Sequence, residues 1–404
     1  MLSATGFMVM AILLLPSLGP ARAASGRLGP LVGAIPTATS LNSSLSGTWT
    51  PFAPSSGQPF GRADAAVAFD PVEGLGVLFG GRAANGTVLN DTWVNDGDYP
   101  GKWGAAPYAA HVAPPPLLDA ALTFDGILNE FLLFGGRLAD GAPYNGTWVF
   151  GNFAWTNLTG HLALAPPVDP DPTMAFDATE GQVVLVSSSD PGATWTFGPG
   201  GWTGLRSTEQ LPPIANATAV ADPLTEGVLL FGGQTHGPDP VALNETWMFQ
   251  SGGWQRASGT AAPPAETRPS MAYDPRIPGV LLYSSATTVA TWTYTSTGWA
   301  QWPGGPLPTA RTDAQLYYDS DASYDSLFGG VAANGSVDAD NWGWSVPPTV
   351  LTPTLGAAAI GLDTWVEVGA VIAVPIVVAL LLRRRPPRAK PTDAPAAAAS
   401  TAPS

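Results

Sequence analysis

Apolar and polar positions recur in one fixed order along most of the chain. At residues 77–93, VLFGGRAANGTVLNDTW, an apolar run ends in two glycines, a polar loop follows, and the loop ends in Thr-Trp. Related stretches occupy 132–148, 184–195, 229–247, 281–292 and 326–342, so the closing Trp returns every 45 to 55 residues. Self-similarity at this period indicates a repeat architecture.

Each repeat contains four short segments with the character of strands. The first is apolar and ends in Asp, as at 65–70, and the second ends in the glycine pair. The third begins at Thr-Trp, and the fourth carries another Trp, as at 200–205. Such runs, separated by turns, predict one four-stranded sheet per repeat, and sheets arranged radially form a β-propeller. The predicted fold class is therefore an all-β, six-bladed propeller.

The tryptophans indicate how the ring closes. Six Trp begin third strands, but only five fourth-strand Trp follow them, at 103, 155, 202, 254 and 299. The sixth is Trp49, which lies before the first repeat. We therefore expect an N-terminal strand to complete the last blade and to remove an exposed sheet edge.

The repeat resembles the kelch repeat, in which a double glycine closes the second strand and two spaced aromatic residues follow. The resemblance covers about residues 45–345 and departs from kelch at 187–188 and 284–285, where Ser-Ser replaces Gly-Gly. It implies a kelch-like propeller of the galactose-oxidase-like superfamily. It does not imply an activity, because one fold carries many functions. Some kelch-like propellers are copper oxidases with a Tyr-Cys crosslink, and this chain has no Cys.

Both ends of the chain indicate a membrane-anchored surface protein. Residues 1–24 are similar to a signal peptide that ends at Ala21-Arg22-Ala23, and residues 366–382 are apolar and followed by three arginines, as a single membrane-spanning helix would be. The expected order is signal peptide 1–24, linker 25–44, propeller 45–345, linker 346–365, transmembrane helix 366–382 and a disordered basic, Pro- and Ala-rich tail 383–404. We expect a single-pass plasma-membrane protein with the propeller outside and the tail cytoplasmic.

Charge limits the partners. Residues 25–365 carry 29 acidic and 10 basic side chains, a net charge near −19, which disfavours nucleic acid and anionic lipid. We expect a surface glycan or a protein as the ligand. The long loops between second and third strands favour a binding face on that side, called the upper face below. Because both ends of the propeller should leave from the opposite face, the upper face should point away from the membrane.

One polar position opens each first strand and is the candidate ligand-binding site. The six residues are Asp64, Asp119, Asp171, Asn216, Arg268 and Asp313. Carboxylates placed there could bind a cation such as Ca²⁺ or hydrogen-bond a sugar. The alternative is the polar lining of a water-filled channel. A second series, the Asp that ends each first strand, is expected to cap turns.

Eight Asn-x-Ser/Thr sequons occur, and Asn85, Asn145 and Asn334, each followed by Gly, are the expected glycosylation sites at exposed loop tips. No catalytic residue and no metal ligand set is identified. The three His lie in loops of different blades, at 111, 161 and 236, without metal-ligand spacing.

Three functions remain open at this stage. The first is a surface binding or adhesion protein that requires no cofactor. The second is a surface enzyme that acts on polysaccharide, a lyase or glycosidase that uses upper-face carboxylates. The third is a structural envelope component without a specific ligand.

Overall fold

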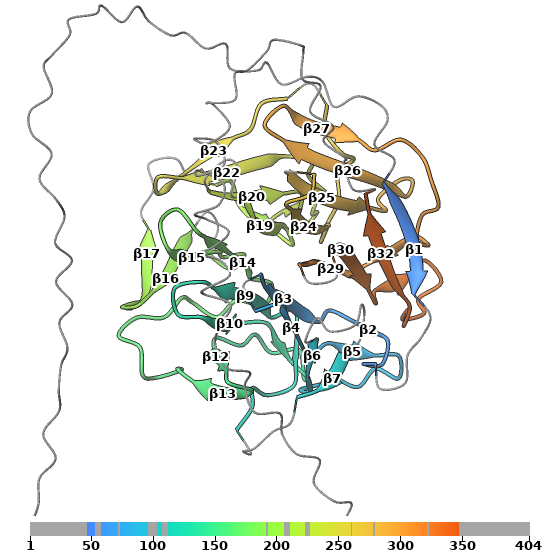
Figure 1. Ribbon diagram of the computed structural model, residues 1–404. Coiled ribbons are helices and arrows are strands. Elements are labelled where there is room, and N and C mark those ends of the chain that lie inside the picture. Colours follow the sequence, from blue (N-terminus) through green and yellow to red (C-terminus); the bar gives the residue numbers. More distant parts are fainter. Residues whose placement is uncertain are drawn as a thin grey trace, which may run out of the picture. The chain divides into compact units, whose positions relative to one another are not determined.

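The computed structural model describes residues 47–346 with gaps at 53–57, 72, 96–102, 107–111, 191–192, 206–210, 223–226, 260, 278 and 321–322. Six four-stranded antiparallel sheets surround a central axis, so the fold is an all-β six-bladed propeller as predicted (Figure 1). The chain divides into a compact unit from Met1 to Pro348 and a second from Thr349 to Ser404, which contains no described residue.

Each blade is given from its innermost to its outermost strand. Blade 1 contains β3 (Ala66–Asp70), β4 (Leu75–Phe79), β6 (Thr92–Asn95) and β7 (Trp103–Ala105). Blade 2 contains β9 (Ala121–Asp125), β10 (Glu130–Phe134), β12 (Thr147–Gly151) and β13 (Ala154–Asn157). Blade 3 contains β14 (Thr173–Asp177), β15 (Gln182–Val186), β16 (Thr194–Gly198) and β17 (Gly201–Leu205).

The remaining three blades follow the same plan. Blade 4 contains β19 (Thr218–Asp222), β20 (Gly227–Phe231), β22 (Thr246–Gln250) and β23 (Gly253–Arg256). Blade 5 contains β24 (Ser270–Asp274), β25 (Gly279–Ser284), β26 (Ala290–Thr295) and β27 (Gly298–Gln301). Blade 6 contains β29 (Gln315–Asp319), β30 (Tyr324–Phe328), β32 (Asn341–Ser345) and β1 (Thr48–Phe52).

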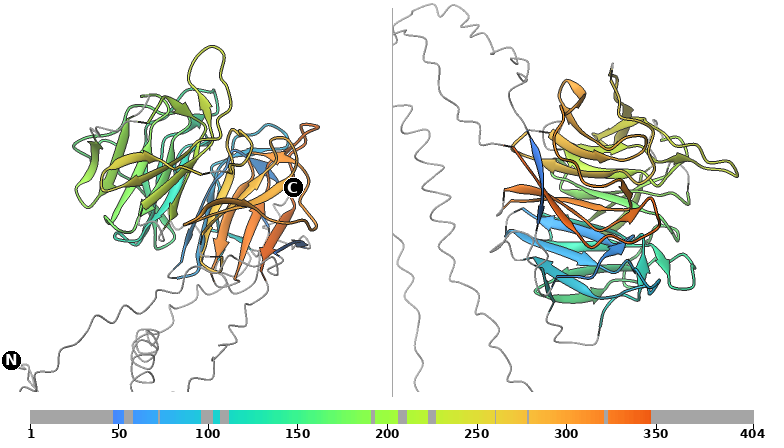
Figure 2. Two further views of the ribbon diagram at one scale, coloured as in Figure 1. Left: turned by 90° about the horizontal axis from the view of Figure 1, so that it is seen from above. Right: turned by 90° about the vertical axis from the view of Figure 1, so that its right-hand side faces the viewer.

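Blade 6 confirms the predicted closure. The N-terminal strand β1 pairs antiparallel with β32, with Thr48 opposite Ser345 and Trp49 opposite Trp344 (Figure 2). The first and last strands of the propeller therefore lie side by side, and their outer ends meet on the lower face. The strand β1 therefore serves as the fourth strand of blade 6 and covers the edge of β32.

The apolar core lies between blades and not at the centre of the ring. Buried side chains form clusters that each join two neighbouring blades, such as the cluster of Phe79, Leu133 and Trp155 between blades 1 and 2. Around the axis, the innermost strands contact one another in the order β3, β9, β14, β19, β24, β29 and back to β3. The central cavity is lined by both polar and apolar side chains, and its polar groups include Asp64, Asp119 and Arg268.

The upper loops differ between two kinds of blade. In blades 1, 2, 4 and 6 the glycine pair leads into a short two-stranded sheet with the segment that precedes the blade. These sheets are β2 (Arg62–Ala63) with β5 (Arg82–Ala83), β8 (Leu117–Leu118) with β11 (Arg137–Leu138), β18 (Ile214–Ala215) with β21 (Gln234–Thr235), and β28 (Arg311–Thr312) with β31 (Val331–Ala332). Blades 3 and 5, with Ser-Ser and shorter loops, have no such sheet among their described residues.

Backbone conformation explains the two kinds of blade. Gly80 and Gly81 both have positive φ, 65° and 90°, and a Cβ on Gly81 would lie 2.7 Å from the Ala63 carbonyl oxygen. Only glycine fits such a close approach. In blade 3 the Asp169 carboxylate accepts hydrogen bonds from the Ser188 amide (2.8 Å) and hydroxyl, so a side chain replaces the backbone partner.

No helix among the described residues is long and apolar enough to cross a membrane. The predicted signal peptide at 1–24, the predicted helix at 366–382 and the predicted tail at 383–404 lie outside the described residues.

Candidate functional site

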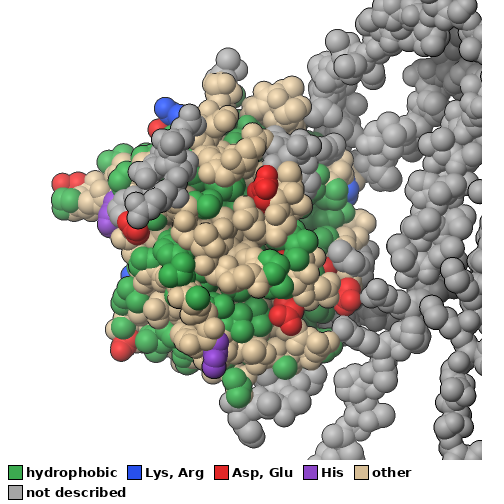
Figure 3. Space-filling view, turned by 90° about the vertical axis from the view of Figure 1, so that its left-hand side faces the viewer, with side chains coloured by type: hydrophobic (Ala, Val, Ile, Leu, Met, Phe, Trp, Pro, Cys, Tyr) green, Lys and Arg blue, Asp and Glu red, His purple; other side chains and the backbone are tan. Residues whose placement is uncertain are grey.

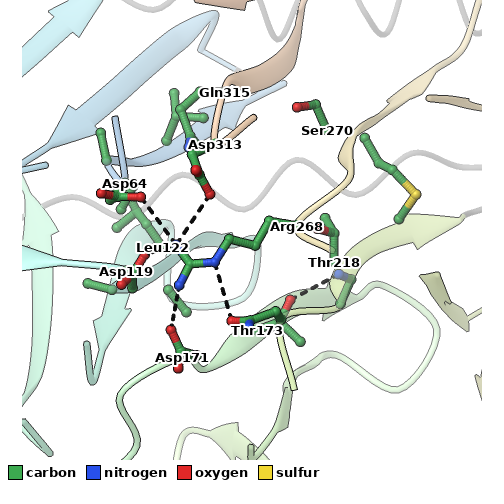
Figure 4. Close-up of a pocket in the computed structure, with 18 of the residues that line it drawn as sticks. Asp64, Asp119, Leu122, Asp171, Thr173, Thr218, Arg268, Ser270, Asp313 and Gln315 are labelled. Atoms are coloured by element: carbon green, nitrogen blue, oxygen red, sulfur yellow. Dashed lines mark hydrogen bonds and ion pairs between the residues drawn. The ribbon is translucent and has the colours of Figure 1, made fainter. Parts of the chain in front are cut away.

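The six predicted positions meet at the upper end of the central channel. Each residue stands two positions before its innermost strand, and all six line one cavity of about 210 Å³ (Figure 4). We call Asp64, Asp119, Asp171, Asn216, Arg268 and Asp313 the mouth ring. The equivalence inferred from the repeats therefore holds in space, while ligand binding by these residues stays a prediction.

The backbone of the mouth ring adopts a conformation that few side chains tolerate. Five of its six residues have φ between 52° and 58°, and the sixth, Asp171, is followed by proline. Asp and Asn enter this left-handed region at modest cost, whereas a long side chain such as that of Arg268 does so rarely. Backbone hydrogen bonds hold the ring, as from Asp119 N–H to the Asp64 carbonyl (3.0 Å) and from Arg268 N–H to the Asn216 carbonyl (2.7 Å).

Arg268 of blade 5 reaches the centre of the ring, and its guanidinium donates to one residue from every other blade. Nη1 donates to Asp64 (3.2 Å), Asp313 (3.3 Å) and Asp119. Nη2 donates to Asp171 (2.7 Å), and Nε donates to Asn216 (3.3 Å). One side chain thus connects the six blades at the channel mouth (Figure 4).

Two further arginines pair with the outer oxygens of the ring carboxylates. Arg82 donates from Nη2 to Asp64 Oδ2 (2.8 Å). Arg137 donates from Nη2 to Asp171 Oδ2, and its Nε lies 3.4 Å from Asp119 Oδ2. The Thr312 hydroxyl donates to Asp313 Oδ2 (2.9 Å). With the contacts of Arg268, each of the four ring carboxylates therefore has a partner at both of its oxygens.

Burial sets the electrostatics of the mouth. It raises the pKa of the Asp64 carboxyl, and the neighbouring carboxylates Asp119 and Asp313 raise it further, against the effect of Arg268. Burial also raises the pKa of Asp119, against the opposing effect of Arg268. The pKa of Arg268 is raised above its usual value because the attraction of the surrounding carboxylates outweighs burial. The guanidinium therefore stays charged.

Arg268 separates two spaces. The cavity of about 210 Å³ lies along the upper parts of the innermost strands. A second space of about 420 Å³ is bordered by four residues of its own and by four residues of the mouth ring. The four residues of its own are Arg82, Leu118, Thr267 and Thr312. Four residues border both: Asp64, Asp119, Arg268 and Asp313. We call this outer space the vestibule.

The arrangement does not fit a Ca²⁺ site. Calcium takes six to eight oxygen ligands, whereas the ring carboxylates already accept hydrogen bonds and enclose the guanidinium of Arg268. Among the described residues no group of three or more His, Asp or Glu is suited to hold a metal ion. Whether Ca²⁺ binds elsewhere stays a prediction.

The lower Asp series has the expected turn-capping geometry. Asp125 Oδ1 accepts hydrogen bonds from the backbone amides of Ile127 (2.9 Å) and Leu128 (3.1 Å), and Asp177 Oδ1 does the same for Thr179 (3.0 Å) and Glu180. These carboxylates are buried. They stabilise turns between the first and second strands.

Sequence reasoning missed two buried arginines that hold upper loops in place. Arg62 donates to both oxygens of Asp91 (2.7 and 3.0 Å) and to the Gly80 carbonyl (2.9 Å). Arg311 makes the equivalent contacts with Asp340 and Gly329 in blade 6. The signal was present in the sequence, because each arginine stands two residues before a ring Asp and each partner Asp precedes a third strand by one residue.

The predicted glycosylation sites Asn85, Asn145 and Asn334 are exposed. Asn85 and Asn334 lie in hairpin turns, where their side-chain oxygens accept the amides of Thr87 (3.0 Å) and Ser336 (2.9 Å). Asn145 is different: the turn of its loop is at Asp140–Gly141, and Asn145 lies just before β12. Its placement at a loop tip was wrong, because the repeat places an Asn two positions before the Thr of the Thr-Trp pair, as at Asn90 and Asn244.

Comparisons with known proteins support the fold. No family model matches the chain, and no curated protein matches it. Many solved structures do. One, "Structure of YjhT", shares 13% sequence identity and superposes with a TM-score of 0.52 over 72% of this chain and 99% of that one. At this level of identity the similarity shows a propeller fold and nothing about the ligand.

Proposed function

We propose that this chain is a membrane-anchored, kelch-type surface protein that binds a glycan or protein ligand at the mouth of its upper face. The mouth ring carries the proposal. Glycine would adopt its backbone conformation without strain, yet six blades place five charged residues and an amide there. Strained polar positions that converge on a cavity are typical of functional sites.

The proposed orientation rests on the ends of the propeller. Thr48 and Ser345 pair at the start of β1 and the end of β32. A predicted membrane segment at 366–382 follows Ser345 after about twenty residues. If that segment anchors the protein, the lower face lies toward the membrane and the upper face is free to meet a ligand.

Binding of the full chain to arrays of surface glycans and proteins, in detergent micelles, tests the proposal. We expect saturable binding that Asp119→Asn and Arg268→Gln weaken at least tenfold. Asp140→Asn is the matched control, since Asp140 is exposed at a loop tip and an Asn side chain can still accept from the Ala142 amide. Equal binding by ring variants and wild type would place the ligand elsewhere, and no saturable ligand would favour a structural envelope component.

One observation favours an enzyme as the second candidate. The raised pKa of the Asp64 and Asp119 carboxyls is a property that a general acid needs. A polysaccharide lyase or glycosidase would keep ligand binding and lose turnover on Asp64→Asn. A binding protein would lose affinity alone.

A further inference from the structure

The part of the mouth that solvent meets is guanidinium, not carboxylate. The side chains of Arg82, Arg137 and Arg268 are 45%, 37% and 29% exposed. The four carboxylates beneath them are between 8% and 18% exposed. A ligand that approaches the upper face therefore meets hydrogen-bond donors first.

The donors are only partly used. Among the contacts of the described residues, Arg82 uses Nη2 alone, and Arg137 uses Nη2 with Nε at the longer distance of 3.4 Å. The remaining N–H groups of both guanidiniums have no hydrogen-bond acceptor among these contacts. A guanidinium carries five donors in a planar fork that matches two oxygens of a carboxylate or sulfate.

The ring carboxylates hold these arginines in place. Asp64 fixes Arg82 from below, and Asp119 and Asp171 fix Arg137. Because the side chains are already ordered, a ligand does not have to order them again, which favours affinity. The carboxylates then serve as supports for the cations and not as ligand contacts.

The side chain that follows each Gly-Gly or Ser-Ser pair changes in character from one side of the mouth to the other. Blades 1 and 2 carry arginine there, blades 3 and 4 carry uncharged polar residues, and blades 5 and 6 carry apolar ones. In blade order these residues are Arg82, Arg137, Ser189, Gln234, Ala286 and Val331. Arg82 borders the vestibule of about 420 Å³, so the basic side of the mouth adjoins an open space.

We infer that Arg82 and Arg137 bind the oxyanion, a carboxylate or a sulfate, of an acidic sugar residue in the ligand. The inference rests on the proposed function and names the class of glycan. Charge-assisted, two-pronged hydrogen bonds are the strongest polar contacts available to an arginine. Since residues 25–365 carry a net charge near −19, affinity arises from short contacts at the mouth and not from long-range attraction.

The test uses three sugars that differ at one carbon. A β-glucoside, a β-glucuronide and a β-glucoside 6-sulfate, which are attached through the same linker at C1 and displayed at equal density, are offered to the full chain in detergent micelles. We expect the two acidic sugars to bind at least tenfold more tightly than the neutral one. Arg82→Gln with Arg137→Gln should weaken the acidic sugars about 10- to 100-fold, as expected for lost hydrogen bonds to charged groups.

Two further variants complete the design. Arg256→Gln is the matched control, because Arg256 is 61% exposed and pairs with Glu245 (2.9 Å) on the outer strand of blade 4. It should bind like wild type. Arg82→Lys keeps the charge above Asp64 but loses the planar fork, so an intermediate loss is expected even if the Gln variants unfold.

Several outcomes would overturn the inference. If neutral and acidic sugars bind equally tightly, and the mouth-ring variants abolish that binding, the proposed site remains supported. The inference that Arg82 and Arg137 recognise an oxyanion would then be wrong. Unchanged acidic-sugar binding by Arg82→Gln with Arg137→Gln, or by Arg82→Lys, would also overturn it. Absence of binding to every glycan and protein on the array would remove the proposed function itself.

Discussion

At the scale of single residues, Arg268 determines the character of the channel mouth. Four carboxylates around one space repel one another, and the guanidinium at their centre reduces that repulsion. Arg82 and Arg137 then neutralise most of the remaining charge from above.

Replacement of Arg268 should be the most damaging single change at the mouth. We expect Arg268→Gln to cost about 2–4 kcal/mol, somewhat less than a fully buried ion pair because the side chain is part-exposed. Arg268→Lys should cost less, since the charge remains while most of the five hydrogen bonds are lost. Thermal unfolding midpoints of the two variants check this order, and a larger loss for the lysine variant would contradict it.

Asp325 should produce a second, pH-dependent effect. Its carboxylate, fully buried between blades 5 and 6, pairs with Arg276 (2.8 Å), which also pairs with Asp274 (2.8 Å). Burial raises the pKa of Asp325 well above its usual value, and Asp274 raises it further. A raised pKa in the folded state means that stability present below pH 3.8 is lost as the pH rises through the folded pKa.

Asp325→Asn should therefore become more stable relative to wild type as the pH rises from 4 to 8. Urea unfolding across this range measures the difference. Asp91→Asn is the control of opposite sign: burial would raise the pKa of Asp91, but hydrogen bonds from Arg62 outweigh it and lower the pKa. That variant should lose stability near neutral pH and lose less in acid. If the stability differences of the two variants from wild type changed with pH in the same direction, the opposite pKa shifts of Asp325 and Asp91 would be contradicted.

The sequence predicted the position of the mouth residues but not their contacts. Aligned repeats place Asp64 and Asp313 at equivalent points, and equivalent points of a propeller meet at one end of the axis. The reach of Arg268 across the channel depends on the channel width and on rotamers, which no repeat pattern encodes. The interpretation of the carboxylates as possible cation ligands overlooked that the chain supplies its own cations.

At the scale of elements, a Trp–Thr hydrogen bond joins neighbouring blades at five of the six seams. The fourth-strand Trp Nε1 donates to the hydroxyl of a Thr in the first two positions of the third strand of the preceding blade. These pairs are Trp155–Thr92 (2.9 Å), Trp202–Thr147 (3.0 Å), Trp254–Thr194 (2.8 Å), Trp299–Thr246 (2.8 Å) and Trp49–Thr291 (2.9 Å). At the seam between blades 6 and 1, Asn341 stands in place of the Thr and accepts instead from Ser326 (2.7 Å).

This exception supplies a control. Trp202→Phe should cost about 1 kcal/mol for the lost hydrogen bond and the unpaired Thr147 hydroxyl, beyond the loss of ring area. Trp103→Phe, in the equivalent strand of blade 1, loses similar ring area but no bond to a threonine. Chemical denaturation of both variants measures the difference, and equal losses would show that the Trp–Thr bond adds nothing.

The Thr-Trp pattern was recognised in the sequence as a repeat boundary, but its role was not. The Trp of this pattern, as at Trp93, donates to Asp91 of its own blade (2.6 Å), whereas the Thr before it accepts from the fourth-strand Trp of the next blade. Only the spatial order of the blades reveals that second pair. The same Thr completes the sequon at Asn145, where Thr147 is buried. The Thr of this sequon is therefore explained by its position between blades, without any need for a glycan at Asn145.

At the scale of the whole molecule, neighbouring blades are joined by apolar clusters, by hydrogen bonds and, at one end, by Arg268. On the face shown in Figure 3, charged side chains are few and scattered, and the exposed hydrophobic groups are interrupted by polar and backbone surface. Phe60 and Val241 are 74% and 62% exposed, and exposed apolar side chains are common on the surfaces of folded proteins.

Removal of residues 1–52 should destabilise the whole ring and not only shorten the chain. Trp49 is 1% exposed and packs against Tyr283 and Trp344, at 6.0 and 5.5 Å between ring centroids. Without β1, the edge of β32 and these rings meet solvent, and an open strand edge recruits other chains. Size-exclusion chromatography with light scattering should show self-association or loss of folded protein, and a monomer as stable as the full chain would contradict this.

The pairing of β1 with β32 also has a consequence for how the protein is made. Thr48 and Ser345 are partners, so the N-terminal strand emerges from the ribosome almost 300 residues before its partner. At about 5–20 residues per second, that wait lasts on the order of 15–60 seconds. During this time five blades can assemble in order of synthesis, but the sixth cannot. Any chain that terminates early, at whatever position before β32, leaves the ring unclosed, which gives cellular quality control a simple difference between finished and unfinished molecules.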